Sequence, residues 1–481
     1  MESIWSQTTD IKSYPPLTED LSADAVVIGG GLAGILTAYL LKQHNIDTIV
    51  LEAKRVGGGQ TRNSTAKITS QHDIIYTKLI DSFGEELASQ YAKANETAIR
   101  DYKQLIEKQS IDCSFEELPA YLYSQNQEDV QRLQKEAEAA KRLGIDAEYT
   151  RDTALPFSVA GAVRFNNQAQ FHPLEFLKAI SEGLKIYEDT RVTKVEDNVV
   201  STNHGKVKAK HIVFATHFPF INMPGFYFAR MHQERSYVIA LKDAIKLDGM
   251  YYGVDEDGLS LRCWNDILLF GGGGHRTGEN SAGGKYAFLR TKAQELIPQG
   301  KEVACWSAQD CITLDGVPYI GQFAASTEKW YVATGFAKWG ISTSMAAANI
   351  ITDMILGREN PYSQVFAPGR FTPSASTKQF ITDLGQSVKG LARQAFTFPD
   401  EQAEKLPAES GGVVEIDGEK VGVYKDENRK LHIVSVRCPH LGCQLEWNPD
   451  EKSWDCPCHG SRFDIEGKLL DNPAQINLDK Y

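Results

Sequence analysis

Two short blocks near the C-terminus combine cysteine and histidine at spacings that can hold a metal centre. Residues 438–443 read Cys-Pro-His-Leu-Gly-Cys, and residues 456–461 read Cys-Pro-Cys-His-Gly-Ser. Together they supply the two thiolates and two imidazoles of a [2Fe–2S] cluster that has cysteines on one iron and histidines on the other. The predicted metal ligands are Cys438, His440, Cys456 and His459. Zinc is the alternative, but six candidate ligands at mixed spacing fit a tetrahedral zinc site poorly.

This pattern resembles that of the Rieske proteins, above all the form found in the respiratory cytochrome bc complexes. The features shared with that family include the proline after each leading cysteine and the Gly-Ser pair after His459. The resemblance implies a disulfide between the two remaining cysteines, Cys443 and Cys458. It also implies a proline loop that covers the cluster, at 467–474.

The same resemblance bears on the reduction potential. Ser461 stands where the family places a hydroxyl on a cluster sulfur, whereas Phe463 stands where its higher-potential members have a tyrosine. Fewer hydrogen bonds to the ligand sulfurs leave the reduced cluster less stabilised. We therefore expect a potential below the top of the Rieske range, which runs from roughly −150 to +300 mV.

The front of the chain carries a glycine pattern of another kind. An apolar run at 24–28 leads into a G-x-G-x-x-G sequence, and a second apolar run ends at an acidic residue. Gly29 allows the tight turn, Gly31 admits a pyrophosphate to the backbone, and Gly34 lets the helix pack on the strand. The helix start binds phosphate, and Glu52 accepts hydrogen bonds from ribose hydroxyls. The unit predicts a dinucleotide site.

A second loop of small residues, at 57–66, favours FAD over NAD. It resembles the loop that passes the flavin ring in FAD oxidoreductases of the D-amino-acid oxidase and glycine oxidase superfamily. Trp306, a Thr-x-Asp-Gly-x-Pro-x-x-Gly signature at 313–321, and the strand and turn at 330–340 match the same family. Beyond the glycine unit, the resemblance implies FAD contacts at Gly59, Thr61, Ser64, Val192, Gly335 and Gly340.

The resemblance also implies a final helix at 341–356 whose positive end points at the flavin and stabilises its reduced form. Ser342 and Thr343 near the start of this helix are candidate caps. Lys338 either adds charge at the same edge of the flavin or is an exposed lysine in a turn.

Four side chains are candidates for catalysis or substrate binding: His72, His275, Lys338 and Asp310. The two histidines are candidate proton acceptors, although a structural histidine is the commoner case. Glycine-oxidase relatives that bind amino-acid carboxylates often carry an arginine between the late tryptophan and the Thr-x-Asp-Gly signature. That interval here contains Asp310 and no arginine. The difference disfavours amino-acid substrates, and Asp310 either attracts a cationic amine or is structural.

These motifs predict an α/β FAD-binding domain of the Rossmann type with an α+β substrate domain, followed by a small all-β Rieske domain. The FAD-dependent part is expected at 21–365 and the Rieske domain at 403–481, joined by a connector at 366–402 with one helix at 377–395. The FAD-binding parts are predicted at 21–80, 150–230 and 306–360, and the cap and substrate parts at 81–149 and 231–305.

Composition limits the location and the partners. The 481-residue chain has a net charge of −12, which disfavours nucleic acid and anionic membrane surfaces. It contains no run of about 18 apolar residues that would span a membrane, and its polar N-terminus shows no secretory signal. We expect a cytoplasmic protein, in which the four scattered cysteines are free thiols and a disulfide is unusual.

The sequence thus predicts a soluble flavin- and Rieske-dependent oxidoreductase. In this interpretation FAD oxidises a small organic substrate, an amine or hydroxy compound, and electrons pass singly through the cluster to an external acceptor, or flow in reverse. The alternative is a redox-sensing or electron-carrier protein with little substrate turnover. A Rieske oxygenase is disfavoured, because its mononuclear iron usually lies downstream of the cluster and few residues follow His459.

Overall fold

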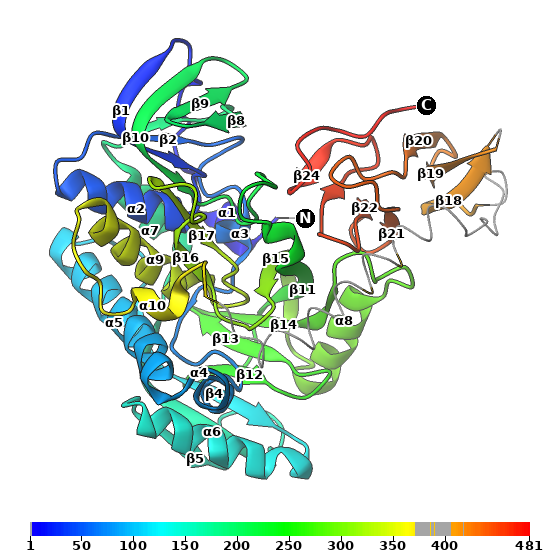
Figure 1. The fold of residues 1–481 in the computed structure, drawn as a ribbon. Helices are drawn as coiled ribbons and strands as arrows, with labels where there is room; N and C mark the ends of the chain where they lie inside the picture. The colour runs from blue at the N-terminus through cyan, green and yellow to red at the C-terminus, as the bar shows by residue number, and fades with distance from the viewer. Residues whose placement is uncertain (1, 371–384, 386–388, 390–405, 417) are drawn as a thin grey trace.

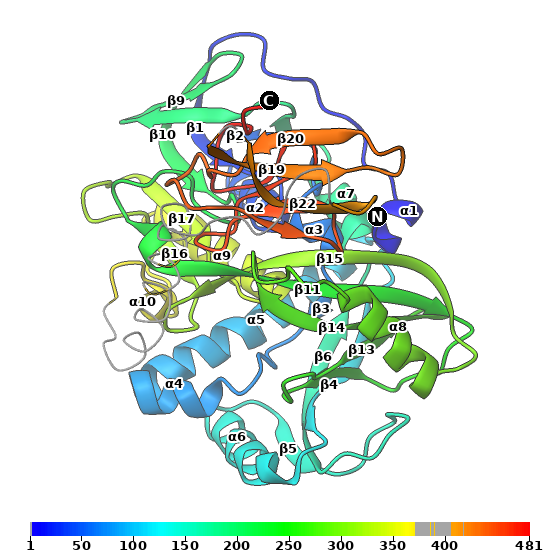
Figure 2. The same ribbon diagram turned by 90° about the vertical axis from the view of Figure 1, so that its right-hand side faces the viewer.

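The computed structural model describes residues 2–370, 385, 389, 406–416 and 418–481. Two large sheets with their helices form the main body, and a small all-β lobe lies against one side of it (Figures 1 and 2). The predicted helix at 377–395 and the predicted connector from 371 onward lie outside the described residues, apart from the single positions 385 and 389.

The first sheet is the dinucleotide-binding sheet. Its strand order is β16-β17-β10-β1-β2-β7, with parallel pairing from β17 to β7 and with β8 and β9 attached beside β10. Its strands are β1 (Leu21–Ile28), β2 (Thr48–Leu51), β7 (Lys185–Tyr187), β8 (Val192–Glu196), β9 (Val199–Thr202), β10 (Lys206–Phe214), β16 (Tyr319–Gln322) and β17 (Trp330–Thr334). The last three residues of β1, β2 and β10 are apolar and buried, and along each strand they alternate between two hydrophobic clusters, so both faces of the sheet are covered there.

The second sheet carries the substrate side of the molecule. Its order is β15-β11-β14-β13-β12-β4-β6-β3, with β5 paired to β6. Its strands are β3 (Lys67–Ile68), β4 (Glu116–Ser124), β5 (Ala147–Thr150), β6 (Gly161–Gln170), β11 (Met231–Lys242), β12 (Met250–Gly253), β13 (Ser260–Trp264), β14 (Ile267–Arg276) and β15 (Lys301–Thr313). The four consecutive glycines at 271–274 lie inside β14 and begin no helix.

Helices pack around the two sheets. They are α1 (Ile4–Thr8), α2 (Leu32–Gln43), α3 (Gln60–Asn63), α4 (Tyr76–Phe83), α5 (Glu85–Gln109), α6 (Val130–Arg142), α7 (Pro173–Ser181), α8 (Lys285–Leu296), α9 (Gly340–Ile355) and α10 (Ser363–Phe366), with 3-10 turns η1 (Gln127–Asp129) and η2 (Tyr227–Ala229). Helix α2 packs against α7 and α9. Within the residues that the structure describes, no helix combines the length and the apolar character needed to cross a membrane.

The N-terminal segment before β1 belongs to the same body. Trp5 in α1 is fully buried, and its indole N–H donates to the backbone oxygen of Ser64 at 2.7 Å. This contact ties the start of the chain to the loop that follows β2.

The all-β lobe contains two small sheets. One is the three-stranded meander β18 (Ser410–Ile416), β19 (Glu419–Lys425) and β20 (Leu431–Ser435). The other is the four-stranded meander β21 (Glu446–Asn448), β22 (Ser453–Asp455), β23 (Arg462–Phe463) and β24 (Leu469–Asp471). The cysteine- and histidine-bearing loops follow β20 and β22, so the two sheets present them together.

Candidate active site and cluster site

The dinucleotide cradle lies between the end of β1 and the start of α2. Gly29 has φ +111°, and a Cβ there would lie 2.3 Å from the backbone oxygen of Ala215, so only glycine fits this turn. Gly31 is the N-cap of α2 and offers no side chain. The Oγ1 of Thr61 accepts the N–H of Leu32 at 3.0 Å and thereby orders the second small-residue loop against the helix start.

Glu52 follows β2 as predicted and is held by the backbone. Its carboxylate accepts N–H groups from Gly30 at 2.7 Å and from Lys54 at 2.8 Å. Burial nevertheless raises the pKa of Glu52. The carboxylate is therefore fixed at the mouth of the cradle.

A cavity of about 1010 Å³ opens from this cradle. All but one of the predicted FAD contacts line it: Gly29, Gly31, Glu52, Gly59, Thr61, Ser64, Val192, Gly335 and Gly340. Gly34 instead packs beneath it, where a Cβ would lie 2.0 Å from the backbone oxygen of Gly29. This is the role in helix–strand packing that the motif predicts for it. The cavity therefore fits an extended dinucleotide in its size and in its lining.

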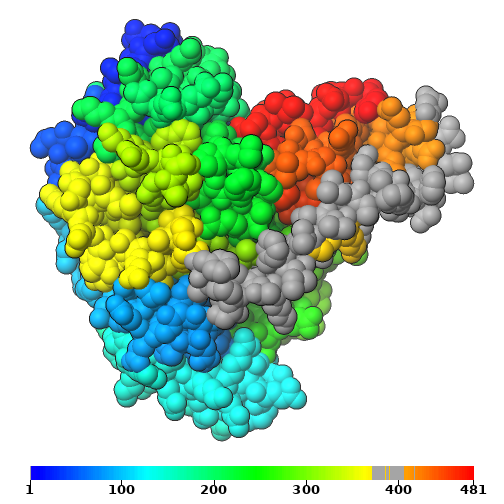
Figure 3. Space-filling model, viewed as in Figure 1, coloured from blue at the N-terminus to red at the C-terminus, as the bar shows by residue number. Residues whose placement is uncertain are grey.

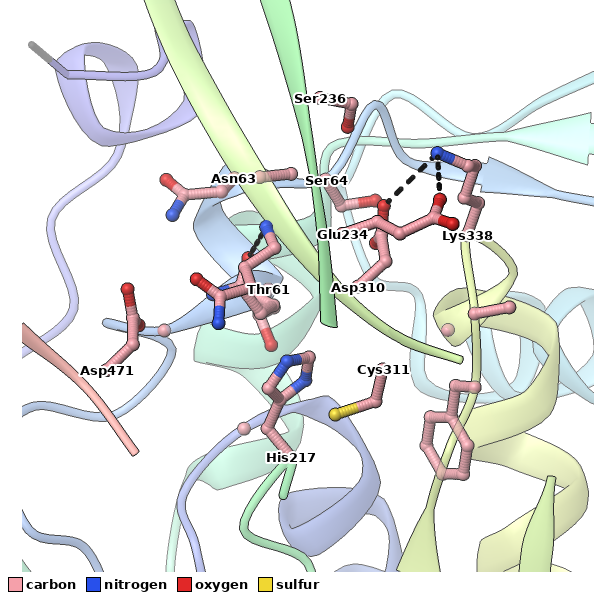
Figure 4. A pocket seen from close by; sticks show the side chains of 18 of the residues that line it. Thr61, Asn63, Ser64, His217, Glu234, Ser236, Asp310, Cys311, Lys338 and Asp471 are labelled. Carbon is pink, nitrogen blue, oxygen red and sulfur yellow. Dashed lines mark hydrogen bonds and ion pairs between the residues drawn. The ribbon is translucent and has the colours of Figure 1, made fainter. Parts of the chain in front are cut away.

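Charged side chains gather in one part of the cavity (Figure 4). Lys338 Nζ lies 3.5 Å from a carboxylate oxygen of Glu234 and 3.8 Å from one of Asp310. The two acids come from neighbouring strands, because Glu234 in β11 pairs directly with Asp310 in β15. Lys338 is therefore a half-buried, ion-paired residue of the cavity wall rather than an exposed lysine in a turn.

The two acids of this cluster differ in their ionisation. Burial raises the pKa of Asp310 to about 6, while Lys338 opposes that rise. Burial also opposes ionisation of Glu234, but its hydrogen bond to His232 and the charge of Lys338 outweigh burial and hold its pKa at about 2. Glu234 is thus a permanent anion, whereas Asp310 can exchange a proton near neutral pH.

The two candidate histidines have different surroundings. His72 lies behind Trp339, with the two rings stacked at 5.0 Å. It donates to the backbone oxygen of Thr69 and accepts from the Tyr91 hydroxyl, both at 2.7 Å, and burial lowers its pKa to about 3. These contacts favour a structural role for His72. His275, in contrast, lines the cavity.

His275 is also engaged by hydrogen bonds. Its Nδ1 donates to the backbone oxygen of Arg276 at 2.7 Å, and its Nε2 accepts from the Tyr237 hydroxyl at 3.0 Å. Burial lowers its pKa, so the ring is neutral at pH 7. It remains a candidate, although it would have to release the tyrosine to accept a proton.

The final helix begins at Gly340, one residue before its predicted start, and its caps differ. Trp339 is the N-cap of α9, and no side chain caps the helix. The prediction that Ser342 and Thr343 are caps is wrong: both lie inside the first turn, and the Ser342 hydroxyl lies 3.1 Å from His72 Nε2. The first turn of α9 reaches the cavity at Gly340 and Ile341, so the positive end of the helix faces it.

The two loops of the small lobe have the same backbone closure. In the outer loop, residues 438–443, the N–H of Cys438 donates to the oxygen of Cys443 at 2.9 Å. In the inner loop, residues 456–461, the N–H of Cys456 donates to the oxygen of Ser461 at 2.8 Å. The loops therefore present equivalent positions to one another.

The predicted cluster ligands converge between these loops. The rings of His440 and His459 lie 4.9 Å apart and perpendicular. The Cys438 and Cys456 thiols share a hydrogen bond, which lowers the pKa of the Cys456 thiol. Nδ1 of His440 is buried without a hydrogen-bond partner among the described residues. A buried imidazole nitrogen without a hydrogen-bond partner has a lone pair that can bind a metal ion. The four predicted ligands therefore fit a [2Fe–2S] cluster.

The remaining cysteines join the loops. Cys443 and Cys458 form a disulfide across 15 positions of sequence, and both residues are 2% exposed. Their sulfurs lie within 4.8 Å of the Cys456 sulfur, a grouping that could suggest a three-cysteine metal site. The disulfide consumes two of those three thiols, so the cysteine–histidine set is the better metal site.

The inner loop docks directly on the main body. Gln309, which lines the cavity, donates from Nε2 to the backbone oxygen of Gly460, and Gln233 donates to that of His459, both at 2.7 Å. Gly460 has φ +82°, and a Cβ there would lie 2.6 Å from the Cβ of Gln233. Glycine is therefore needed for this close approach.

A buried ion pair supports the same interface. Arg235 Nε donates to Glu451 at 2.9 Å, and its Nη1 donates to Gln309 Oε1 at 3.1 Å. Burial opposes ionisation of Glu451, but Arg235 and Arg462 outweigh it and hold its pKa at about 2. In Figure 3 the orange and red surface of the small lobe adjoins the green surface of the main body.

Comparison with known proteins agrees with this geometry. Residues 24–354 match the family of FAD dependent oxidoreductases, and residues 397–481 match the Rieske [2Fe-2S] domain. The chain belongs to the FAD-dependent oxidoreductase family and carries a Rieske domain. The protein accordingly binds FAD and a [2Fe–2S] cluster.

Individual relatives cover either the whole chain or its larger part. A Bacillus subtilis (strain 168) protein, named as the Rieske 2Fe-2S iron-sulfur protein YhfW, is 38% identical over 99% of this chain and 98% of its own length. The gamma-glutamylputrescine oxidoreductase of Escherichia coli (strain K12) is 22% identical over 72% of this chain and 86% of its own. The crystal structure of glycine oxidase from Geobacillus kaustophilus superimposes with a TM-score of 0.63 and 18% identity, covering 73% of this chain and 99% of that one.

Sequence reasoning missed several residues of the FAD oxidoreductase site. Glu234 completes the charged cluster, and Gln233, Arg235, Gln309 and Glu451 connect the main body to the Rieske domain. A signal was present at 232–235, where four polar residues precede the apolar part of a strand. Buried polar residues at the start of a core strand need partners, and here the Rieske domain supplies those of Gln233 and Arg235.

Proposed function

We propose that the protein oxidises a small cationic amine in the FAD cavity and passes the electrons singly through the Rieske cluster to an external acceptor. The observation that carries this proposal is the hydrogen bond from Gln309, in the cavity wall, to Gly460, next to the cluster ligand His459. Bound FAD supplies the acceptor for a hydride, and the cluster supplies a one-electron carrier. Direct contact between the two sites keeps the transfer distance short.

The charged side chains that line the cavity favour a cationic amine as the substrate. Glu234 and Asp310 share a single ammonium group, that of Lys338. Asp73 adds a third carboxyl to the lining, although burial raises its pKa. Burial lowers the pKa of Lys67, the other lysine in this part of the lining, to about 7, so it is only partly charged at neutral pH. The site therefore holds more negative than positive charge, which favours a cationic ligand.

Asp310 also suits the proton chemistry of such a reaction. An ammonium group must lose a proton before the adjacent carbon can be oxidised, and a base with a pKa near the working pH accepts it most effectively. Burial gives Asp310 a pKa of about 6. Lys338 holds its carboxylate in the cavity wall at 3.8 Å. Among the relatives, gamma-glutamylputrescine oxidoreductase bears the name of an amine, which supports the same class of substrate.

The test is anaerobic reduction of the holoprotein by matched compounds. The set contains primary and secondary amines, their uncharged N-acetyl derivatives, and α-hydroxy acids. We expect an amine to bleach the flavin absorbance and then to produce the EPR signal of the reduced Rieske cluster, while its N-acetyl derivative does neither. Bleaching by hydroxy acids alone would contradict the amine, and a flavin that is reduced without the cluster would contradict the electron transfer.

The pH dependence offers a second readout. Asp310 is ionised above its pKa of about 6, so kcat/KM should fall as the pH decreases through that value. Asp310→Asn should remove this limb of the profile and lower kcat/KM by about a hundredfold, the middle of the range for a proton-transfer group. Asp243→Asn, at an exposed ion pair, is the matched control and should leave the profile unchanged.

A redox sensor is the weaker candidate. Its sensing element would be the Cys443–Cys458 pair, but both residues are buried to 2% exposure. Exchange requires attack on a sulfur that solvent thiols can reach. We expect no reaction of this pair with a thiol reagent under native conditions after mild reduction, and rapid reaction would favour the sensor.

A further inference from the structure

One segment of the Rieske domain forms part of the wall of the FAD cavity. Five residues of the segment 469–475 line that cavity: Leu469, Leu470, Asp471, Asn472 and Gln475. Figure 4 draws the side chain of Asp471 among the lining residues, together with Thr61 and Asn63 of the FAD domain. We call residues 469–475 the covering segment. The cavity that fits the dinucleotide is therefore built from both domains.

Hydrogen bonds fasten the covering segment to two sides of the glycine turn. On one side, Lys54 Nζ donates to the backbone oxygen of Leu470 at 2.7 Å. On the other side, Asn472 Nδ2 donates to the backbone oxygens of Thr216 at 3.0 Å and of Phe218 at 2.7 Å. Lys54 lies just beyond the end of β2, and Thr216 lies just beyond the end of β10. Because β1 lies between these strands and pairs in parallel with both, the segment is held on both sides of the turn that follows β1.

This position matters because of the sheet that lies beneath it. In parallel α/β sheets the ligand binds outside the carboxyl ends of the strands. The residues that follow the ends of β1, β2 and β10 include Gly29, Glu52 and Thr216, and all three line the cavity. The covering segment is fastened next to these residues. A dinucleotide bound at the strand ends would therefore be enclosed between the two domains.

The covering segment is also tied to the inner cluster loop. The N–H of Ala474 donates to the Ser461 hydroxyl at 3.0 Å. Gln233 Nε2 donates both to the backbone oxygen of Asn472 at 3.0 Å and to that of His459 at 2.7 Å. The segment therefore cannot leave the cavity wall without disturbing the contacts by which the Rieske domain docks.

A further docking contact lies outside the cavity wall. The carboxylate of Asp450 accepts the N–H of Gly284 at 3.1 Å, the N–H of Lys285 at 2.9 Å and the side-chain amide of Asn280 at 2.9 Å. Gly284 is the N-cap of α8 and has no side chain, so a carboxylate from the other domain caps this helix. Asp450 is not among the residues that line the cavity. A change at this residue can therefore loosen the domain without altering the FAD site itself.

We propose that the Rieske domain retains FAD, because the covering segment must leave the cavity wall before the cofactor can be released. The rate of FAD release is then proportional to the fraction of molecules in which the domain has loosened. By reciprocity, bound FAD stabilises the docked domain, since only the docked arrangement encloses it. The proposal goes beyond the proposed function, because it holds for any substrate and for either direction of electron flow.

The experiment measures the release of FAD from the full-length holoprotein. Protein loaded with radiolabelled FAD is diluted into an excess of unlabelled FAD, and the label that stays bound is followed over time. The test variants are Asn472→Leu, which removes two bonds of the covering segment, and Asp450→Ala, which removes the contacts with α8. The matched control is Asp426→Ala, because Asp426 Oδ1 also accepts two backbone N–H groups, from Asn428 and Lys430, but within a turn of the Rieske domain. Cluster absorbance and urea unfolding show whether each variant is folded.

We expect both test variants to release FAD about thirtyfold faster than the wild-type protein, because each loses at least two hydrogen bonds of the docked state. Asp426→Ala should release it at the wild-type rate. Wild-type rates in both test variants would overturn the proposal, and so would acceleration in only one of them, because a shared docking equilibrium requires both to respond. Equal acceleration by Asp426→Ala would assign the effect to general loss of stability and would also overturn it. No substrate is used, so the outcome is independent of the proposed function.

Discussion

The two ligand loops of the Rieske domain have the same chemistry and opposite surroundings. Both begin with Cys-Pro, both provide one cysteine and one histidine, and both close with the same backbone hydrogen bond. Every residue of the inner loop, 456–461, is buried, and Gln233 and Gln309 bond to its carbonyls. The outer loop, 438–443, is partly open to solvent around Leu441.

The two loops contribute equivalent sets of ligands but have different surroundings. Each loop supplies one cysteine and one histidine, so nothing in the motif separates a side that receives electrons from a side that releases them. The inner loop is entirely buried against the FAD domain, whereas Leu441 of the outer loop is exposed even though Asn222 of the FAD domain bonds to His440. Each prediction below tests whether the loops differ because of this covering.

The largest loss of stability is expected when the ion pair that supports the inner loop is broken. Arg235→Met leaves Glu451 buried with Arg462 as its remaining cation, and the low pKa of Glu451, about 2, keeps it ionised. Removing one partner of a buried pair costs about 3 kcal/mol or more of unfolding free energy. Urea unfolding followed by cluster absorbance measures the loss.

The control for Arg235 is an exposed arginine pair. Arg290 bonds to Glu302 with a side chain that is about half exposed, and Arg290→Met should cost under about 1 kcal/mol. Equal losses for the two variants would mean that the domain interface contributes no more to stability than the surface does.

A similar loss of stability is expected when the disulfide that joins the two loops is removed. Replacing Cys443 and Cys458 together by alanine opens a loop of 15 residues, which lowers the unfolding free energy by about 3 kcal/mol. Cys263→Ala, at a free and partly buried thiol, is the control. If the docked FAD domain alone holds the inner loop, the double variant will unfold at the wild-type urea concentration.

The sequence predicts this site well where the chemistry is local. Ligand spacing within 438–443 and 456–461 and the glycines at 29–34 lie within single loops, so their roles follow from short-range geometry. The pairing of Glu234 with Asp310 depends on the β11–β15 register, which joins strands far apart in the chain. The partners Asn222 and Gln309 depend on how one domain docks on another, and no local pattern encodes that docking.

The third prediction compares the two loops by their effect on the rate of electron transfer from flavin to cluster. Gln309→Leu removes the side-chain hydrogen bonds of Gln309 to Gly460, Gln233 and Arg235. The bonds to Gly460 and Gln233 lead to the inner loop, and at ~1 kcal/mol each they correspond to roughly a thirtyfold slower transfer from flavin to cluster if they position that loop. Asn222→Leu, at the outer loop, should leave this internal step unchanged. Anaerobic stopped-flow reduction, with flavin and cluster followed separately, measures both. Equal slowing by the two variants would remove the distinction between an inner and an outer side.

The smallest expected effect is a change in the reduction potential of the cluster, caused by residues next to the inner loop. The Ser461 hydroxyl hydrogen-bonds to the Cys438 thiol, while Phe463, two residues on in β23, is fully buried and has no hydroxyl to offer. Phe463→Tyr adds a donor, and a hydrogen bond to a charged sulfur worth ~1.5 kcal/mol raises a one-electron potential by about 60 mV. Phe463→Leu should leave the potential near the wild-type value, because it changes packing without adding a donor. In a redox titration followed by EPR, an unchanged or lower potential in the tyrosine variant would show that the added hydroxyl does not reach a sulfur. If the wild-type potential lies below the top of the Rieske range, that position would then have to arise from the burial of the inner loop itself.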